Sequence, residues 1–355
     1  MKDNHNLDLL RAIAVILVVV EHILLAMHVQ SIASWNVAWI GVVGVFFFFV
    51  HTSLVLMWSL DRRPSVLDFY LRRFFRIYPL AMAVILATLA FHLPTMQSPN
   101  GDTFFRSPGF RLAISNLLLV QNVLWRGNIL GVMWTLPLEV DMYFLLPYLY
   151  FFVKRERRLW PFLMLWIATA IYDRATFPAD DNTFVACMPY FLSGVLAYLL
   201  FSRRVPQCVP VVLMPVLLLG LLSAFMAHPS FRNGWFLTLI TGLALPFFRP
   251  LRTKWIASIS HQIAKYSYGI YLIHPFSIAL GINYLHNYNL AFRIIVVISS
   301  LVALVVPAYH LLEKPMIDFG ARLAKGIADP ENGDVLRSKR INDSMSMPIR
   351  GSVDH

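Results

Sequence analysis

The stretch LDLLRAIAVILVVVEHILLAMHV, residues 7–29, decides the fold, because it is a hydrophobic segment of membrane-spanning length that carries an arginine, a glutamate and a histidine. About 20 apolar residues are enough to cross the hydrocarbon core of a bilayer. Arg11 and His22 are eleven positions apart, so in a helix they share one face, about 16 Å apart along the axis. An arginine at the bilayer centre costs on the order of 2.5–3.5 kcal/mol. We therefore predict a membrane protein in which these side chains face partners or water inside the protein.

The composition also indicates a membrane protein. Of the 355 residues, 58% are hydrophobic and 14% are charged, whereas a soluble domain has roughly 25% charged residues. The recurring apolar runs lack the polar face that a soluble helical protein would need, which excludes that class. We predict an all-α, polytopic membrane helix bundle with about ten transmembrane helices. They cover about residues 7–29, 37–60, 77–94, 131–152, 159–173, 184–201, 210–227, 234–249, 266–285 and 291–312.

The distribution of charge predicts the orientation of the bundle. Basic residues cluster in alternate loops, at residues 62–76, 154–158, 203–204 and 249–254, and in the C-terminal tail. The intervening loops, at residues 30–36, 173–182 and 286–289, are neutral, acidic or nearly so. By the positive-inside rule both termini are cytoplasmic. The net charge of +11 is therefore assigned to orientation, and we expect no nucleic-acid partner.

We predict one integral-membrane domain, residues 1–319, followed by a flexible cytoplasmic tail, residues 320–355, that is polar and poor in aromatic residues. The first apolar run lacks a signal-peptide cleavage pattern and is expected to stay as an anchor. Between the third and fourth helices, residues 114–123 fit an interfacial amphipathic helix. The expected location is the inner (plasma) membrane of a bacterial-type cell, as a multi-pass protein.

His22 is the first candidate for chemistry, because histidine titrates nearest physiological pH and suits general acid–base catalysis. The alternative is a structural histidine with satisfied hydrogen bonds. Arg11 on the same helix face favours function. A salt bridge between Arg11 and Asp8, three residues earlier, is an equally open role for the arginine and is compatible with function. The adjacent Glu21 lies about 100° around the helix from His22, and its role stays open.

Three arginines stand in the loop before the third predicted helix. Arg72, Arg73 and Arg76 precede Pro79, and a guanidinium group matches a phosphate with two parallel hydrogen bonds. They are candidates for holding a phosphorylated cofactor at the cytoplasmic side. The alternative is orientation charge together with contacts to anionic lipid head groups.

Two later helices carry further polar side chains. Glu139 and Asp141 lie deep in the fourth predicted helix on nearly opposite faces, whereas Glu139 and Tyr143, four residues apart, share a face. An ion pair of Glu139 with an arginine of another helix is the structural alternative to a functional cavity. Tyr271 and His274, three residues apart, share one side of the ninth helix. Either a helix kink or a substrate contact explains them.

Several other chemistries find no support in the sequence. The remaining histidines have no metal-ligand spacing and there is no Cys–His cluster, so we expect no metal and no permanently bound cofactor. No glycine-rich phosphate loop or serine nucleophile motif occurs. Cys187 and Cys208 are the only cysteines, and we expect no disulfide between them.

Five motifs occur in order along the chain. They are LDLLRAIA with His22 (residues 7–22), RRFFRIYP (72–79), WTL with Glu139, Tyr143 and Pro147 (134–147), SYGIYLIHP (267–275) and EKP (313–315). Together they resemble acyltransferase family 3, integral-membrane enzymes that O-acylate carbohydrates and other acceptors with acyl-CoA. The resemblance covers about residues 7–318. Phe46, Thr52-Ser53 and Val140-Asp141 depart from the family pattern, which bears on the acceptor and the acyl group rather than on the reaction type.

The resemblance implies that His22 is catalytic and that Arg73 and Arg76 serve acyl-CoA. Acetyl-CoA is the expected co-substrate, because the family mostly transfers acetyl groups. The expected acceptor is a carbohydrate or a lipid-linked sugar on the outer side, and membrane lipids are the other expected partners. The remaining predicted site residues are Glu139 in catalysis, Arg11 and Arg72 in acyl-CoA binding, and Tyr143, Tyr271 and His274 in substrate binding.

Two other classes of function stay open. A transporter or flippase for a sugar, lipid or acid would explain Arg11, His22 and Glu139 equally well, since buried charges line such paths. It gives no reason for the arginine triplet or for the order of the motifs. A non-catalytic membrane scaffold predicts that His22→Ala behaves like the wild type.

Overall fold

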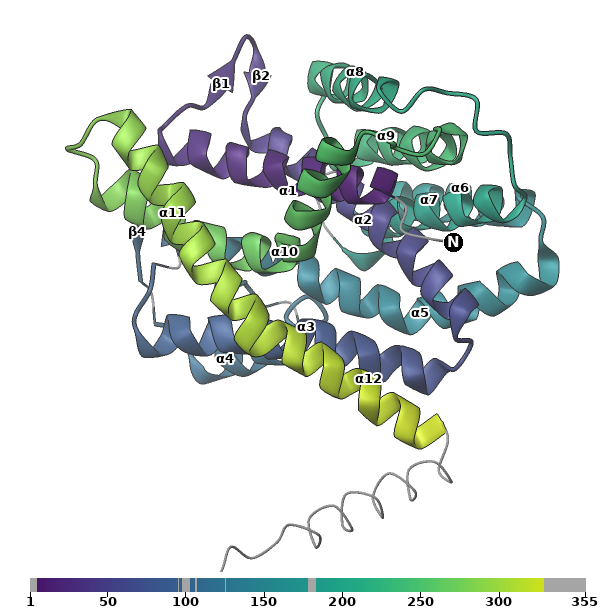
Figure 1. Cartoon of the computed structure of the whole chain (residues 1–355), viewed down its shortest axis with the longest axis horizontal. Coiled ribbons are helices and arrows are strands. Elements are labelled where there is room, and N and C mark those ends of the chain that lie inside the picture. Colours follow the sequence, from purple (N-terminus) through teal and green to yellow (C-terminus); the bar gives the residue numbers. More distant parts are fainter. Residues whose placement is uncertain are drawn as a thin grey trace, which may run out of the picture.

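The computed structural model describes residues 5–94, 96–97, 103–105, 107–124, 126–177 and 183–328. The described chain is mostly helical, as predicted (Figure 1). The α-helices are α1 (His5–Ala26), α2 (Ala38–Arg62), α3 (Val66–Ala90), α4 (Phe110–Leu117), α5 (Thr135–Glu156), α6 (Trp160–Thr176), α7 (Phe184–Ser202), α8 (Leu213–Ala227), α9 (Phe231–Ala244), α10 (Lys254–Ile278), α11 (Leu290–Ala308) and α12 (Lys314–Ala328).

Short elements join these helices. The 3-10 helices are η1 (Gly131–Trp134) and η2 (Leu245–Phe247), and the π-helices are η3 (Ala279–Tyr284) and η4 (Tyr309–Glu313). Two antiparallel hairpins pair β1 (Ser31–Ile32) with β2 (Trp35–Asn36) and β3 (Met96–Gln97) with β4 (Thr103–Phe104). The register pairs Ser31 with Asn36 in the first and Met96 with Phe104 in the second.

Six helical stretches in the described residues are long and apolar enough to cross a membrane. They are α1, α2, α3, η1 with α5, α7, and the continuous stretch from α11 through α12. The other four predicted segments also form helices, namely α6, α8, α9 and α10. The protein is thus an all-α, multi-pass membrane protein, while the count of ten spans and the orientation of the termini stay predictions.

The core of the bundle lies around α2 and α7. Phe46 and Phe47 of α2 and Phe191 of α7 are fully buried. Gly194 allows the two helices to approach closely, because a Cβ atom added there would lie 2.2 Å from Ser53 Oγ and 2.3 Å from the Val50 carbonyl. Ser53 uses this proximity to donate a 2.7 Å hydrogen bond to the Phe191 carbonyl.

The third helix begins earlier than predicted. Residues 72–76 were expected in a loop, but α3 begins at Val66 and contains all three arginines. The helix starts there because the Ser65 side chain caps it, accepting a hydrogen bond from the Asp68 amide. The arginines are therefore held on a rigid helix, on its second and third turns.

Two further boundaries differ from the predictions. The interfacial helix expected at residues 114–123 is α4, which ends at Leu117 and is followed by turns. The predicted tail, residues 320–355, begins inside α12, which packs along α3 and extends to Ala328. In Figure 1, α11, η4 and α12 form one long diagonal helix across the molecule. Residues 329–355 lie outside the described residues.

Candidate functional site

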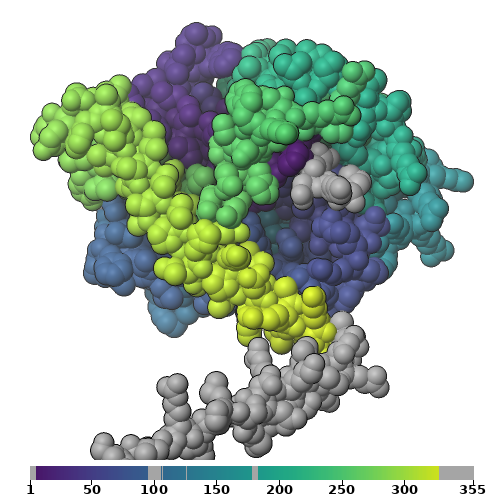
Figure 2. All heavy atoms as spheres, in the orientation of Figure 1, coloured from purple at the N-terminus to yellow at the C-terminus, as the bar shows by residue number. Residues whose placement is uncertain are grey.

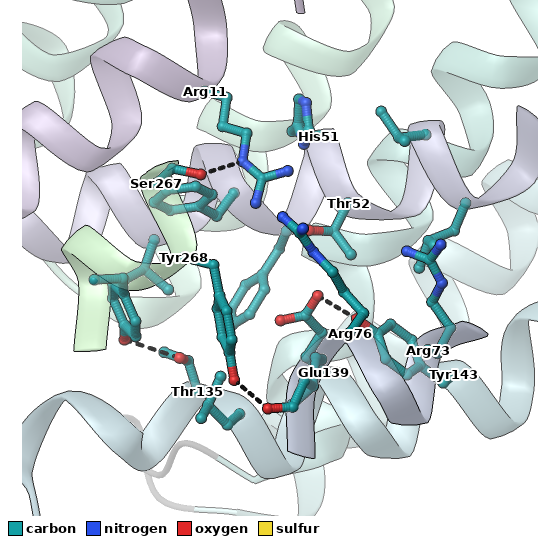
Figure 3. A pocket seen from close by; sticks show the side chains of 18 residues that line it. Arg11, His51, Thr52, Arg73, Arg76, Thr135, Glu139, Tyr143, Ser267 and Tyr268 are labelled. Atoms are coloured by element: carbon teal, nitrogen blue, oxygen red, sulfur yellow. Dashed lines mark hydrogen bonds between the residues drawn. The ribbon is translucent and has the colours of Figure 1, made fainter. Parts of the chain in front are cut away.

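A cavity between α1, α2, α3, α5 and α10 brings together most of the predicted site residues (Figure 3). About 760 Å³ of it, open solvent included, is not occupied by atoms. We call it the arginine cavity. Its predicted members are Arg11, Arg73, Arg76, Glu139, Tyr143 and Tyr271, and its other polar lining residues are His51, Thr52, Thr135, Ser267 and Tyr268.

Arg11 is directed into this cavity. Its Nε donates a 2.6 Å hydrogen bond to Ser267 Oγ on α10, and Ser267 is fully buried. Asp8, the alternative partner considered for Arg11, instead lies 3.0 Å from the Nδ1 of His261. The charge of Arg11 is therefore presented to the interior, as the shared face with His22 predicted.

Arg73 and Arg76, three residues apart on α3, also line the cavity. Arg76 forms a 2.7 Å ion pair with Glu313, whose side chain is only 1% exposed. The π-helix η4 positions this carboxylate, an example of π-turns placed at functional sites. Among the described residues, Arg73 Nε is buried without a hydrogen-bond partner, so this guanidinium keeps capacity for a ligand.

Arg72 does not line the arginine cavity, and its role in acyl-CoA binding stays a prediction. Its Nε donates to both carboxylate oxygens of Asp68, at 2.9 and 2.8 Å, and its Nη2 donates to the Ala321 carbonyl at 3.4 Å. One position along a helix turns a side chain by about 100°. Arg72 therefore faces α12, while Arg73 faces the interior.

Glu139 and Tyr143 form the α5 wall of the cavity. The Tyr143 hydroxyl donates a 2.6 Å hydrogen bond to Glu139 Oε1. The cavity and its rim hold the guanidinium groups of Arg11, Arg73 and Arg76 against the carboxylates of Glu139 and Glu313. Buried charges require compensation. One positive charge remains in excess, so the cavity favours an anionic ligand.

Asp141 turns away from the arginine cavity, as its predicted face requires. It accepts a 2.5 Å hydrogen bond from the Asn122 side chain and lines a separate cavity with Gln121 and Trp134. Glu139 and Asp141 of α5 thus line different cavities.

Tyr271 and Thr135 close one wall of the arginine cavity. Thr135 Oγ1 lies 2.8 Å from the Tyr271 hydroxyl, which also donates to the Val132 carbonyl at 2.6 Å. The Tyr271 ring lies 6.3 Å from the ring of His274, and His274 contacts His22 edge-on with ring centroids 4.8 Å apart. The rings of Tyr271, His274 and His22 therefore lie one after another, with His22 farthest from the cavity.

His22 lies beyond this pair and does not line the arginine cavity. Its Nδ1 is 2.9 Å from the Val18 carbonyl, which can only accept a hydrogen bond, and also contacts the Glu21 carboxylate. The proton of a neutral imidazole is then on Nδ1, which leaves Nε2 as an acceptor. The His22 side chain is 36% exposed.

The carboxylate that contacts His22 is Glu21, while the catalytic role of Glu139 stays a prediction. Glu139 accepts the hydrogen bond of Tyr143 and lines the arginine cavity instead. Gly41 of α2 leaves the space for Glu21, because a Cβ atom added at Gly41 would lie 2.6 Å from Glu21 Oε2. The sequence indicated this contact only in that Glu21 and His22 are adjacent. The two residues point about 100° apart around the helix, and the flexible Glu21 side chain bends to bring its carboxylate to His22.

Sequence reasoning also missed three groups in the cavity. Ser267 and Glu313 lie in two of the five motifs but had no assigned role, and His51 had no assigned role either. His51 is buried and lines the cavity next to Arg11. Their partners lie on helices far apart in the sequence, so local patterns could not pair them.

The comparison with known families identifies the class of protein that this site belongs to. The model of the acyltransferase 3 family, described as an acyltransferase domain, matches residues 4–311. The chain belongs to acyltransferase family 3. It is therefore a membrane acyltransferase, as the five motifs predicted.

A curated relative agrees with this assignment. The acyltransferase MdmB of Streptomyces mycarofaciens is 27% identical over 282 residues, which cover 70% of this chain and 71% of the relative. No solved structure matches the chain significantly. Within this family 3 acyltransferase, the arrangement offers a cavity lined by three arginines and, beyond its Tyr271 wall, a histidine whose Nε2 is left as an acceptor.

Proposed function

We propose that this acyltransferase moves an acyl group, chiefly acetyl, from cytoplasmic acyl-CoA to a hydroxyl group of a carbohydrate or glycolipid acceptor on the outer side of the membrane. The observation that carries the proposal is the continuous arrangement from Arg73 and Arg76, through Tyr271 and His274, to His22. Acyl-CoA carries phosphates at one end and a thioester at the end of a long thin arm. Its phosphates can therefore bind in the arginine cavity while its thioester reaches His22.

The chemical step follows from the geometry of His22. Its Nε2 takes the proton of the acceptor hydroxyl, and the hydroxyl oxygen attacks the thioester carbonyl carbon. The C–O bond forms as the C–S bond breaks, and the departing thiolate takes the proton from the imidazolium. The Val18 carbonyl and Glu21 hold Nδ1, which aims Nε2 at the acceptor. A general base of this kind contributes about 10²–10⁴-fold.

The cavity supports the donor end of the reaction. Arg73 and Arg76 present guanidinium groups for phosphate oxygens, and Arg11 stands between them and α10. Glu139 holds Tyr143 in place at the same wall. A two-step route through an acyl-histidine at His22 is the alternative to direct transfer. A labelled acyl-enzyme trapped without acceptor would favour that route.

The test uses the full-length protein in proteoliposomes, with acetyl-CoA outside or inside and carbohydrate acceptors on the opposite side. Release of free thiol and labelled ester would be measured for the wild type and for His22→Ala. We expect transfer only when donor and acceptor are on opposite sides, and a loss of about 10²-fold or more in His22→Ala. Equal transfer by both proteins would refute the role of His22.

A further inference from the structure

A second cavity continues the arginine cavity toward the surface. Leu7 and Asp8 of α1, Trp58 and Arg62 of α2 and Lys265 of α10 are among its lining residues. It shares Arg11, His51, Val55 and Arg76 with the arginine cavity. About 1530 Å³ of it, open solvent included, is not occupied by atoms. We call it the mouth cavity. Figure 2 shows the surface hollowed between α10, in green, and the α2–α3 region, in blue.

The mouth cavity contains positive charge that the protein does not compensate. Its acidic residues have partners other than Lys265 and Arg62, since Asp8 is bonded to His261, which lines the same cavity, and Asp61 is paired with Lys154. Lys265 donates only to the Tyr266 hydroxyl, at 3.2 Å. Within the described part of the chain, neither Lys265 nor Arg62 has an acidic partner. Two cations without an acidic partner at an open cavity form a site for multiply charged anions.

Aromatic side chains lie next to these cations. Tyr309 of η4 and Trp58 of α2 line the same cavity. The Lys265 ammonium lies 4.9 Å from the centre of the Tyr309 ring and 4.7 Å from that of Tyr266, so the cation and the ring form one unit. Stacking of a nucleobase on an aromatic side chain is worth about 1–3 kcal/mol. Phosphate-binding cations beside an aromatic ring therefore fit a nucleotide better than inorganic phosphate or a simple acid.

We propose that the mouth cavity binds the nucleotide part of the donor, with its phosphates at Lys265 and Arg62 and its purine against Tyr309. This inference rests on the proposed acyl-CoA donor and deepens it. The site selects a thioester that carries an adenosine bisphosphate head over the same thioester on bare pantetheine. Arg73 and Arg76 then contact the inner, pantetheine-proximal phosphate and arm, a separate part of the donor.

The test compares three donors with the full-length protein in nanodiscs: acetyl-CoA, acetyl-dephospho-CoA and S-acetylpantetheine. We expect the wild type to show a KM that rises at least tenfold from the first donor to the last. Lys265→Ala and Arg62→Ala should raise the KM for acetyl-CoA about tenfold, change kcat less than twofold and leave S-acetylpantetheine kinetics unchanged. Arg63→Ala, the adjacent exposed arginine that lines neither cavity, is the matched control.

Equal KM increases for acetyl-CoA and S-acetylpantetheine in Lys265→Ala, or no increase for either donor, would overturn the proposal. Binding of adenosine 3′,5′-bisphosphate, measured by calorimetry, tests the site without turnover. At least tenfold weaker binding in Lys265→Ala than in Arg63→Ala supports it, and equal or absent binding in all proteins overturns it. If no thioester is turned over while the bisphosphate still binds through Lys265, the acyl-CoA function fails and the nucleotide site stands.

Discussion

At the scale of single residues, the structure separates the roles of neighbours that look alike in the sequence. Arg72 pairs with Asp68 while Arg73, one residue later, faces the cavity. Glu139 bonds to Tyr143 and lines the arginine cavity, whereas Glu21 contacts His22. The side of the helix on which a residue stands therefore decides its function.

Glu21 is expected to position His22 rather than to take part in donor binding. Glu21→Gln should lower kcat about tenfold or more, because it removes the negative charge that holds the Nδ1 atom of His22. This loss should be smaller than the roughly 10²–10⁴-fold loss expected when a general base is removed. The donor KM should stay within twofold, since Glu21 lines neither the arginine cavity nor the mouth cavity. Glu21→Asp should recover part of kcat. Steady-state kinetics check this, and a KM effect without a kcat effect would contradict the role.

Arg73 and Arg72 make a matched pair for donor binding. A hydrogen bond to a charged group contributes about 1.5–3 kcal/mol, so Arg73→Ala should weaken acetyl-CoA binding roughly tenfold or more. Arg72→Ala should change it less than threefold, because Arg72 faces α12. Calorimetry on both variants in nanodiscs tests this. Equal losses would mean that the two arginines share a site.

At the scale of elements, the positions of the apolar helices were predictable because hydrophobic length alone sets them. The start of α3 was not, since Arg72, Arg73 and Arg76 depress the hydropathy of a segment that Ser65 caps as a helix. The pairing of Arg76 with Glu313 depends on how α3 meets η4. Long-range packing of that kind leaves no periodic signal in the sequence.

The close approach of α2 and α7 depends on Gly194. Gly194→Ala should destabilise the protein by about 1–3 kcal/mol through overpacking, because the new Cβ atom meets Ser53 Oγ and the Val50 carbonyl. Gly220→Ala on α8 is the control, as a Cβ atom there meets nothing within 4 Å. Thermal unfolding in detergent should show a lower midpoint for Gly194→Ala only. Identical midpoints would contradict the tight α2–α7 crossing.

At the scale of the whole molecule, the mouth and arginine cavities adjoin each other, and His22 lies beyond Tyr271 and His274 at the far side of the arginine cavity. The pattern of basic loops predicts that the mouth faces the cytoplasm. Donor and acceptor would then approach from opposite sides of the bundle.

Labelling with a membrane-impermeant maleimide in spheroplasts checks this orientation. Cys208 is exposed on a loop predicted to be cytoplasmic, whereas Ser31 is exposed in the β1–β2 hairpin on the predicted outer side. Ser31→Cys in a Cys208→Ser background should react in intact spheroplasts. Cys208 of the wild type should react only after permeabilisation. The reverse pattern would contradict the predicted orientation of the bundle.

One experiment separates donor binding from chemistry in a single preparation. Acetyl-CoA binding and turnover would be measured with wild type, His22→Ala and Arg76→Ala in nanodiscs. We predict that His22→Ala binds acetyl-CoA as tightly as the wild type without turning it over, and that Arg76→Ala binds it at least tenfold more weakly. Turnover by His22→Ala at the wild-type rate, or unchanged binding by Arg76→Ala, would contradict a histidine base served by a donor in the arginine cavity.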